Sequence, residues 1–347
     1  MRFLLKALRW LLGGAAIMLV VAAVALAIFR WQADARETRN ATEAAPPSGR
    51  YVRAHDIDMF VQEEGPADAP AVVFIHGTGA WSETWRPTLK AVAKAGFRAI
   101  AVDLPPFGYS ERPASLRYER PDQAKRIIGA LDTLSLKQVI LVGHSFGAGP
   151  TVEATLAAPV RFRALVLVDA ALGLQPTNEE SNSNGVVPHL LNLQPLRDSL
   201  VATFLTNPQF TKRLVQSFIA NPALATDERI ALYQQPLNVK GTTPAVGAWL
   251  PALLLPPNGA RSSQIAAYQT LTMPVHIIWG ALDTVTPLQQ GEHIRKITPK
   301  ATLAVMPDVG HIPQFEDATQ FNAVLLRFLT PLLNQPEPAA LAPSAPQ

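Results

Sequence analysis

The chain has 347 residues, of which 48% are hydrophobic and 16% charged, and this composition excludes a protein that is disordered over most of its length. The absence of cysteine excludes disulfide bonds, thiolate metal sites and a cysteine nucleophile. The chain has a net charge of +3, and residues 1–39 hold six basic and two acidic side chains, a net +4, so the remainder carries −1. Because the folded body has no basic excess, we expect no nucleic-acid partner.

The first predicted element is an apolar helix near the N-terminus. Residues 10–29 are uncharged, and a helix of that length spans a hydrocarbon core of about 30 Å. We expect residues 1–30 to form an uncleaved transmembrane anchor. A cleavable signal sequence is the alternative, because basic residues precede the apolar run and Ala25-Leu26-Ala27 resembles a cleavage site. We expect a single-pass protein with its N-terminus inside and its body on the periplasmic or extracytoplasmic side.

A polar linker over residues 31–50 leads to the folded body, which opens with a predicted exposed hairpin over 51–62. Six short apolar runs rich in β-branched residues follow, without the polar alternation of a half-exposed strand: 71–75, 98–102, 138–142, 164–168, 275–279 and 301–305. Such runs are typical of strands buried on both faces of a parallel sheet. An apolar stripe with helical spacing separates two of them, at Ile127, Ile128, Leu131 and Leu134. The pattern predicts a doubly wound, mostly parallel α/β fold.

The strand pattern is interrupted between residues 173 and 271, where prolines punctuate short apolar helical patterns. We therefore expect core segments over 51–172 and 272–333, a helical cap over 173–271, and a disordered, proline-rich tail over 334–347. A cap over the ends of the strands would cover a bound ligand. Its large apolar side chains would either line the ligand site or pack the cap onto the core: Phe204, Phe210, Phe218, Trp249 and residues 253–255.

The strongest chemical motif is the segment 143–147, Gly-His-Ser-Phe-Gly, which follows a predicted strand and opens a helix. In a G-x-S-x-G sequence the serine lies on a sharp turn, and the glycines let the backbones approach closely. The motif predicts Ser145 as a nucleophile and the Phe146 N–H as a donor to an oxyanion. We expect the second donor at the Thr78 N–H, in the glycine-containing segment after the first parallel strand. A plain glycine turn is the alternative for that segment.

A serine nucleophile needs a histidine base. Of the seven histidines, His311 lies on the loop directly after the last predicted strand. The carboxyl ends of parallel strands share one edge of a sheet, so this loop is expected beside Ser145. His144 adjoins the serine but is expected to point away from it, and His76 is expected to make a structural hydrogen bond within its own loop.

The base in turn needs a carboxylate that orients it. Asp283 occupies the loop after the preceding predicted strand and is the expected acid. Asp169, at the end of the run 164–168, is the main alternative because it could also reach the histidine. Asp308 is a weaker candidate, since its position suits a turn.

These motifs, in this order, resemble the α/β-hydrolase superfamily over residues 51–333. They are His76-Gly77, Asp103-Leu-Pro-Pro-Phe-Gly-Tyr-Ser110, Gly143-His-Ser-Phe-Gly147, Trp279-Gly-Ala-Leu-Asp283 and Gly310-His311. The resemblance implies the α/β-hydrolase fold, the triad order Ser, Asp, His, and a cap domain inserted after Asp169.

Ser145 stands where haloalkane dehalogenases and epoxide hydrolases have aspartate. Hydrolases of C–C bonds look similar near His76 but commonly have a longer glycine-proline loop with an asparagine, where this chain has residues 80–85. Pro106 replaces a usual glycine.

Together these features predict an esterase- or lipase-like serine hydrolase. It would cleave carboxylic ester bonds of a small to medium hydrophobic substrate through an acyl-enzyme, with no metal ion or organic cofactor. Two alternatives stay open: a C–C bond or amide hydrolase with the same triad, and a non-catalytic binding protein on the hydrolase fold.

Overall fold

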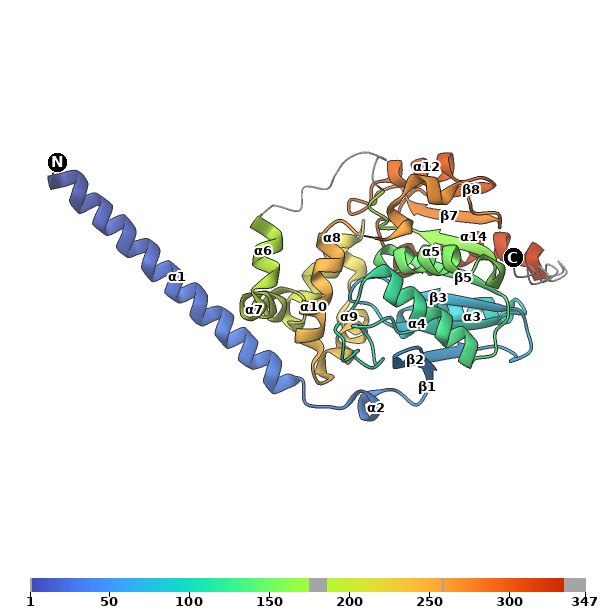
Figure 1. Ribbon diagram of the computed structural model, residues 1–347, viewed down its shortest axis with the longest axis horizontal. Coiled ribbons are helices and arrows are strands. Elements are labelled where there is room, and N and C mark those ends of the chain that lie inside the picture. The colour runs from blue at the N-terminus through green and yellow to red at the C-terminus, as the bar shows by residue number, and fades with distance from the viewer. Residues whose placement is uncertain (1, 175–185, 258, 334–347) are drawn as a thin grey trace, which may run out of the picture.

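The computed structural model describes residues 2–174, 186–257 and 259–333 (Figure 1). The predicted disordered tail, 334–347, lies outside the described residues. An eight-stranded sheet forms the centre of the body, in the order β1-β2-β4-β3-β5-β6-β7-β8. The strands are β1 (Gly49–Ala54), β2 (Ile57–Glu64), β3 (Ala71–Ile75), β4 (Arg98–Val102), β5 (Val139–His144), β6 (Phe162–Val168), β7 (Val275–Gly280) and β8 (Ala301–Met306).

The sheet is parallel from β4 to β8, and β1 and β2 add an antiparallel pair at one side. The predicted mostly parallel, doubly wound sheet is confirmed. The leading hairpin also forms, but the expectation that it is exposed is wrong for its second strand. Residues 61–64 of β2 pair with 99–102 of β4, so β2 lies inside the sheet and buries Met59, Phe60 and Val61.

Helices cover both faces of the sheet (Figure 1). On one face, Ile127, Val152 and Ile294 of α4, α5 and α12 join the larger hydrophobic core. On the other face, Leu89 and Phe321 of α3 and α14 join a second core. This two-sided burial explains why a central strand such as β3 consists of apolar residues alone. These helices are α3 (Arg86–Lys94), α4 (Arg120–Thr133), α5 (Ala148–Ala157), α12 (Leu288–Ile297) and α14 (Ala318–Leu333), with a short α13 (Pro313–Glu316) before the last.

Between β6 and β7, the described residues form helices and turns, with one isolated β-bridge at Val239. We call α6 to α11 the inserted helices. Trp249 of α10 is fully buried, and its ring centroid is 4.9 Å from that of Phe107 and 5.0 Å from that of Phe146. Since Phe107 and Phe146 follow the carboxyl ends of β4 and β5, the inserted helices cover that edge of the sheet. They are α6 (Val186–Asn192), α7 (Gln194–Phe204), α8 (Pro208–Phe218), α9 (Asp227–Gln234), α10 (Thr242–Leu254) and α11 (Ile265–Tyr268).

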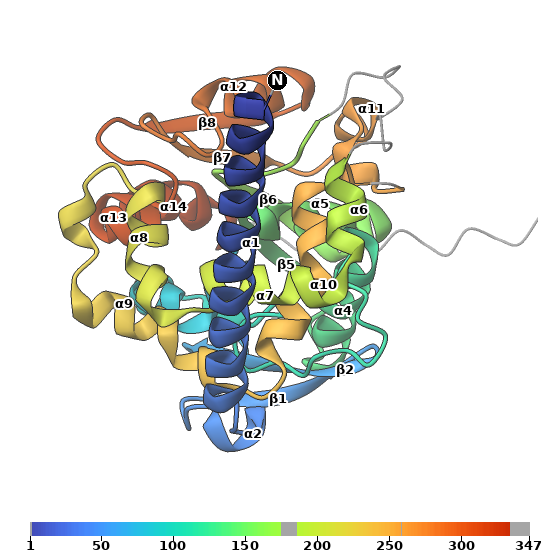
Figure 2. The ribbon, with the colours of Figure 1, turned by 90° about the vertical axis from the view of Figure 1, so that its left-hand side faces the viewer.

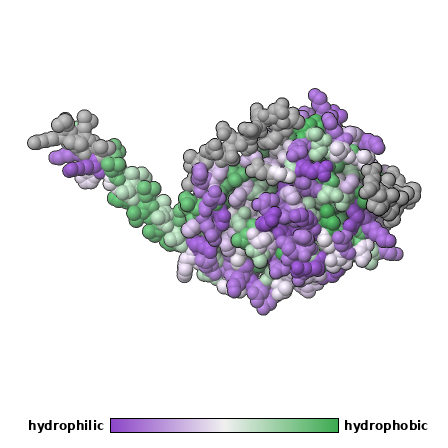
Figure 3. Space-filling view, in the orientation of Figure 1, coloured by the Kyte–Doolittle hydropathy of each residue, from purple (hydrophilic) through white to green (hydrophobic). Residues whose placement is uncertain are grey.

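The N-terminal helix α1 (Arg2–Arg36) projects from the body as a long rod (Figures 1 and 2). Large apolar side chains along it are exposed, including Trp10 and Leu19, and they form an apolar band in the space-filling view (Figure 3). Among the described residues, one helix is long and apolar enough to cross a membrane, over Arg9–Arg36. A signal sequence meets the same criteria. The C-terminal end of α1 is docked on the body, where Ala33 is fully buried, and the short α2 (Ala41–Ala44) follows it.

Candidate active site

Ser145 lies on a sharp turn between β5 and α5. Its φ of +51° is a left-handed conformation that residues with a side chain rarely adopt. The two glycines of the motif make the turn possible. A Cβ at Gly147 would overlap the carbonyl oxygen of His76, and a Cβ at Gly143 would lie 2.8 Å from the Ala148 backbone. The segment therefore has the geometry of a nucleophile elbow.

The structure brings Ser145, His311 and Asp283 into one hydrogen-bonded chain. Oγ of Ser145 lies 2.8 Å from Nε2 of His311, and Nδ1 of the same ring lies 2.8 Å from Oδ2 of Asp283. All three residues are buried. Because Nδ1 faces a carboxylate it carries the proton, which leaves Nε2 free to accept the proton of the serine hydroxyl. The predicted nucleophile, base and acid thus lie in the order that proton transfer requires.

Asp283 is held by its own loop. Its Oδ1 accepts the backbone N–H groups of Val285 and Thr286 at 2.7 and 2.9 Å, and its Oδ2 accepts the Thr286 hydroxyl at 2.6 Å. Burial acts to raise the pKa of this carboxyl, but the hydrogen bonds and charge of His311, together with the bonds from Thr286, outweigh it and lower the pKa. Asp283 is therefore ionised at neutral pH and can stabilise a protonated His311.

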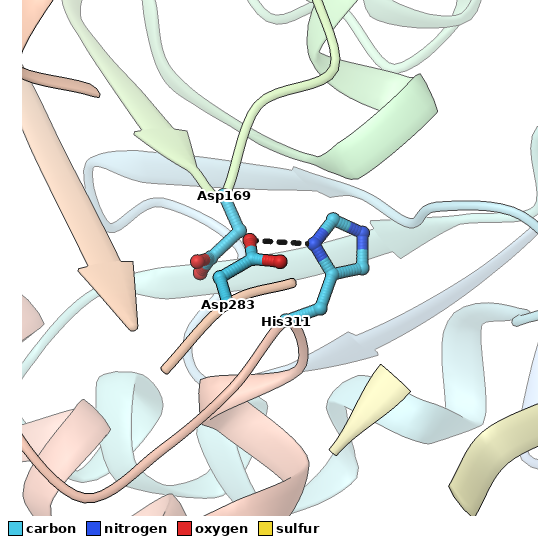
Figure 4. A group of neighbouring side chains, drawn as sticks. All are labelled: Asp169, Asp283 and His311. Carbon is cyan, nitrogen blue, oxygen red and sulfur yellow. Dashed lines mark hydrogen bonds and ion pairs between the residues drawn. The ribbon is translucent and has the colours of Figure 1, made fainter. Parts of the chain in front are cut away.

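Asp169, the alternative acid, lies beside Asp283 at the end of β6 (Figure 4). Its side chain is fully buried, and Oδ1 accepts the Gly280 N–H at 2.9 Å. No hydrogen bond joins it to His311 within the described residues. Burial, and then the charge of Asp283, raise the pKa of Asp169 well above its usual value. The geometry therefore favours Asp283 as the partner of His311, and burial favours the protonated form of Asp169.

The same three side chains are close enough together to be compared with a metal site. Ligand atoms of Asp169, Asp283 and His311 lie within 4.8 Å of one another. However, Nδ1 of His311 lies within hydrogen-bond distance of Oδ2 of Asp283, at 2.8 Å, and a metal ion bound to both atoms would displace the proton between them. The arrangement of Asp283 and His311 suits a hydrogen bond between them better than coordination of a metal ion.

The other histidines near the site have structural partners. Nδ1 of His76 donates to the Gly77 carbonyl and Nε2 accepts the Leu104 N–H, each at 2.8 Å. Burial lowers the pKa of His76 to about 4. Nε2 of His144 lies 2.8 Å from the carbonyl oxygen of His311, so this ring contacts the backbone of the base rather than Ser145.

Thr286 is a site residue that the sequence reasoning missed. Besides its two bonds to Asp283, its hydroxyl lies 3.2 Å from Nδ1 of His311. A signal was present in the sequence, because a threonine three residues after an aspartate on a loop can donate both its N–H and its hydroxyl back to the carboxylate.

A narrow cavity opens beside the predicted oxyanion segment. Its lining includes Thr78 from that segment, and Phe218 and Ile312 from the side of the base. The ring centroid of Phe218 is 5.8 Å from that of His311. Most of the lining is apolar, and Arg112 is its one cationic side chain among the described residues. A substrate in this cavity would be held mainly by apolar contacts.

The large apolar residues of the inserted helices divide between the two predicted roles. Phe218 lines the cavity, whereas Trp249 packs α10 onto the core. Phe204 is 53% exposed and pairs with Phe210, with ring centroids 5.9 Å apart. Residues 253–255 line a separate surface hollow that also includes Phe146.

Comparison with known proteins identifies the family. A sequence model described as alpha/beta hydrolase fold matches residues 70–318. A 2-hydroxymuconate semialdehyde hydrolase of Pseudomonas sp. (strain CF600) is 32% identical over 296 residues, covering 84% of this chain and 96% of the relative. A 2-hydroxy-6-oxononadienedioate/2-hydroxy-6-oxononatrienedioate hydrolase of Burkholderia vietnamiensis is 29% identical, covering 81% and 92%.

Two solved structures agree with this fold. A meta-cleavage product hydrolase from Pseudomonas fluorescens is 23% identical with a TM-score of 0.64, covering 82% of this chain and 98% of the other. A bacterial membrane phospholipase A is 19% identical with a TM-score of 0.64, covering 96% and 99%. At these identities the likeness shows the fold alone. With the family match over residues 70–318, the chain belongs to the α/β-hydrolase fold family.

Proposed function

We propose that the chain is a serine hydrolase with Ser145 as nucleophile, His311 as base and Asp283 as the orienting acid. One observation carries this proposal: an unbroken line of hydrogen bonds, 2.8 Å at each step, leads from a buried carboxylate to a hydroxyl on a strained turn. A turn with φ of +51° at a serine costs free energy, and such strain persists where the local geometry serves a function.

In this mechanism, the Ser145 oxygen attacks the carbonyl carbon of the substrate while Nε2 of His311 takes the hydroxyl proton. The N–H groups of Thr78 and Phe146 are the proposed donors to the oxyanion, each contributing about 3 kcal/mol. His311 then returns its proton to the leaving group as the bond to the carbonyl carbon breaks. A water molecule, deprotonated by His311, releases the acyl group and restores Ser145.

Cleavage of a C–C bond next to a carbonyl is the first candidate for the reaction. The curated relatives at 28 to 32% identity are named as hydrolases of semialdehyde and oxo-dienoate compounds, whose reaction breaks a C–C bond. In that case the leaving group is a stabilised carbanion, and the proton from His311 ends on carbon. The relatives favour this reaction over the ester cleavage predicted from the sequence.

Ester cleavage is the second candidate, with an alkoxide as leaving group. It is favoured by residues 80–85, which lack the asparagine expected in C–C hydrolases. These residues form a packed turn in which Trp81 and Trp85 are buried and the Ser82 N–H is bound to Asp103 at 2.6 Å.

The two reactions are separated by one panel of assays on the full-length chain in detergent. 2-Hydroxymuconate semialdehyde and p-nitrophenyl esters of short acyl chains are offered in parallel, and labelling by a fluorophosphonate probe measures an activated serine. Ser145→Ala and His311→Ala should abolish turnover and labelling, whereas the exposed His293→Ala is the matched control. Absence of labelling in folded wild-type protein, or labelling that survives Ser145→Ala, would refute the proposed triad.

We also propose that α1 anchors the protein in a membrane, with the body on the extracytoplasmic side and the inserted helices acting as a cap. The exposed apolar band over Arg9–Arg36 supports the anchor. Protease treatment of spheroplasts tests the topology: the body should be digested from outside. A protein that starts after residue 27, detected by mass spectrometry, would instead indicate a cleaved signal sequence.

A further inference from the structure

We infer that the segment directly after the apolar helix positions the active site, with Glu37 as the positioning residue. This inference rests on the proposed function, because it concerns the rate of the reaction at Ser145. Its basis is a direct contact between residues 33–40 and α10. This inserted helix contacts both the cavity and the turn that holds Ser145.

Residues 33–40 are built into the body rather than acting as a loose tether. The backbone N–H of Arg39 donates to the Asn238 carbonyl at 3.2 Å, and the Lys240 N–H donates to the Arg39 carbonyl at 2.8 Å. These two bonds form a parallel β-bridge between Arg39 and Val239. Nε of Arg36 also donates to the Leu237 carbonyl at 3.1 Å. The segment is thereby fixed against the residues that lead into α10.

Glu37 caps the N-terminus of α10. Both of its carboxylate oxygens lie 3.0 Å from the backbone nitrogen of Thr243, and one also accepts the Thr243 hydroxyl. The residue that precedes α10 is Gly241, which has no side chain with which to cap the helix. The first N–H groups of a helix lack internal partners and attract negative charge. The carboxylate of Glu37, 206 positions away from Thr243, therefore provides the capping acceptor that the residue before α10 lacks.

The capped helix reaches both parts of the site. Thr242 and Val246 of α10 line the cavity, and the Thr242 hydroxyl accepts a hydrogen bond from Arg112 at 3.0 Å. Two turns further on, Trp249 packs against the ring of Phe146, the residue after the nucleophile. A change in the first turn of α10 would therefore move the cavity wall and the packing of a proposed oxyanion donor together.

Removal of the carboxylate would leave costly unpaired groups. Glu37 is only 7% exposed, and so the Thr243 N–H would lose its acceptor, and the Thr243 hydroxyl one of its two partners, in a place that water reaches poorly. The Thr243 hydroxyl also contacts the Thr206 hydroxyl at 2.7 Å, which ties α10 to the residues after α7. We therefore expect the start of α10 to shift when Glu37 is truncated.

The test compares Glu37→Ala, Glu37→Gln and Glu43→Ala in the full-length chain in detergent. Glu43 is the matched control because it is an exposed carboxylate in the same linker, bonded to Asn40. The readouts are kcat and KM for the substrate found active in the panel, and the rate constant of fluorophosphonate labelling per folded molecule. Glu37→Ala should lower kcat/KM and the labelling rate about tenfold. Glu37→Gln keeps an acceptor for Thr243 and should restore most of both, and Glu43→Ala should match wild type.

A purely structural cap would give a different result. In that case, Glu37→Ala would lower the melting temperature while folded molecules kept the wild-type labelling rate and kcat/KM, and the inference would be wrong. If Glu37→Ala does not fold, Thr243→Val replaces it, because it removes the hydroxyl contact and keeps the backbone N–H; unchanged kinetics in that variant would also overturn the inference. A wild-type protein that is never labelled would refute the proposed function itself, which is a distinct outcome.

Discussion

Substitution of Asp283 by asparagine should nearly abolish catalysis although it changes few atoms. The surrounding bonds fix how the new amide is oriented. Two backbone N–H groups, from Val285 and Thr286, point at Oδ1, so the amide oxygen must stay there. The NH2 group is then directed at Nδ1 of His311, which has to become an acceptor. The ring proton moves to Nε2, which faces the Ser145 hydroxyl at 2.8 Å and can no longer receive its proton.

The alternative orientation of the amide does not rescue the site. Turned the other way, the NH2 group would oppose both backbone N–H groups and forfeit two hydrogen bonds, at about 1 to 3 kcal/mol for each unsatisfied group. The same Asp to Asn change in a Ser-His-Asp triad lowers kcat about 10⁴-fold, which corresponds to about 5.5 kcal/mol of transition-state stabilisation. We expect a loss of this order in the Asp283→Asn variant.

The assay is kcat for the active substrate, together with fluorophosphonate labelling, and Asp169→Asn is the matched control. Burial and the charge of Asp283 raise the pKa of Asp169 and so favour its uncharged form, and asparagine can still accept the Gly280 N–H. Asp169→Asn should therefore keep activity within a few fold. Retention of more than a tenth of kcat in Asp283→Asn, with a large loss in Asp169→Asn, would refute the reasoning and identify Asp169 as the acid.

Two further predictions concern stability. Burial lowers the pKa of His76 from 6.5 to about 4. As the pH falls from 6.5 to 4, the unfolded chain therefore binds a proton at this residue that the folded chain does not, and the free energy of unfolding should decrease by about 3 kcal/mol. Urea titrations at pH 7 and 4.5 should show a weaker pH dependence of stability in His76→Asn than in wild type, and an equal dependence would contradict this. Gly147→Ala should lower stability by about 1 to 3 kcal/mol and abolish labelling, because its Cβ overlaps the His76 carbonyl oxygen; an unchanged melting temperature would contradict the close approach.

The sheet could be predicted because its strands carry a local signal. A strand covered on both faces lacks polar alternation, and so the runs 71–75 and 98–102 predict the bounds of β3 and β4 correctly, although β4 begins with Arg98. The burial of β2 was not predictable in the same way. Its polar residues Gln62, Glu63 and Glu64 look exposed in sequence, yet the strand pairs on both sides.

The candidate triad could be predicted because each member follows a strand. Parallel strands bring the loops at their carboxyl ends together, which is a consequence of topology and needs no knowledge of side-chain contacts. The choice between Asp283 and Asp169 was different, since both follow strands. It depends on which carboxylate the ring of His311 faces, and only the three-dimensional geometry, in which Nδ1 of His311 lies 2.8 Å from Asp283, favours one of them.

The contacts of residues 33–40 could not be predicted from sequence. Residues 31–50 are polar and end in prolines, which is typical of a flexible tether. Nothing local marks Glu37 as the partner of Thr243, because the two residues are 206 positions apart. Only the missing capping side chain at Gly241 hints that α10 takes its cap from elsewhere.

The docked end of α1 sets a limit on how this protein can be shortened for work in solution. A cut at the start of the folded body, near Ser48, would remove the apolar helix and, with it, the bridge at Arg39 and the helix cap at Glu37. A cut between residues 29 and 32 would remove most of the apolar run and keep both contacts. The two shortened proteins would differ by fewer than 20 residues, but the first would report on a disturbed site and the second on the native one.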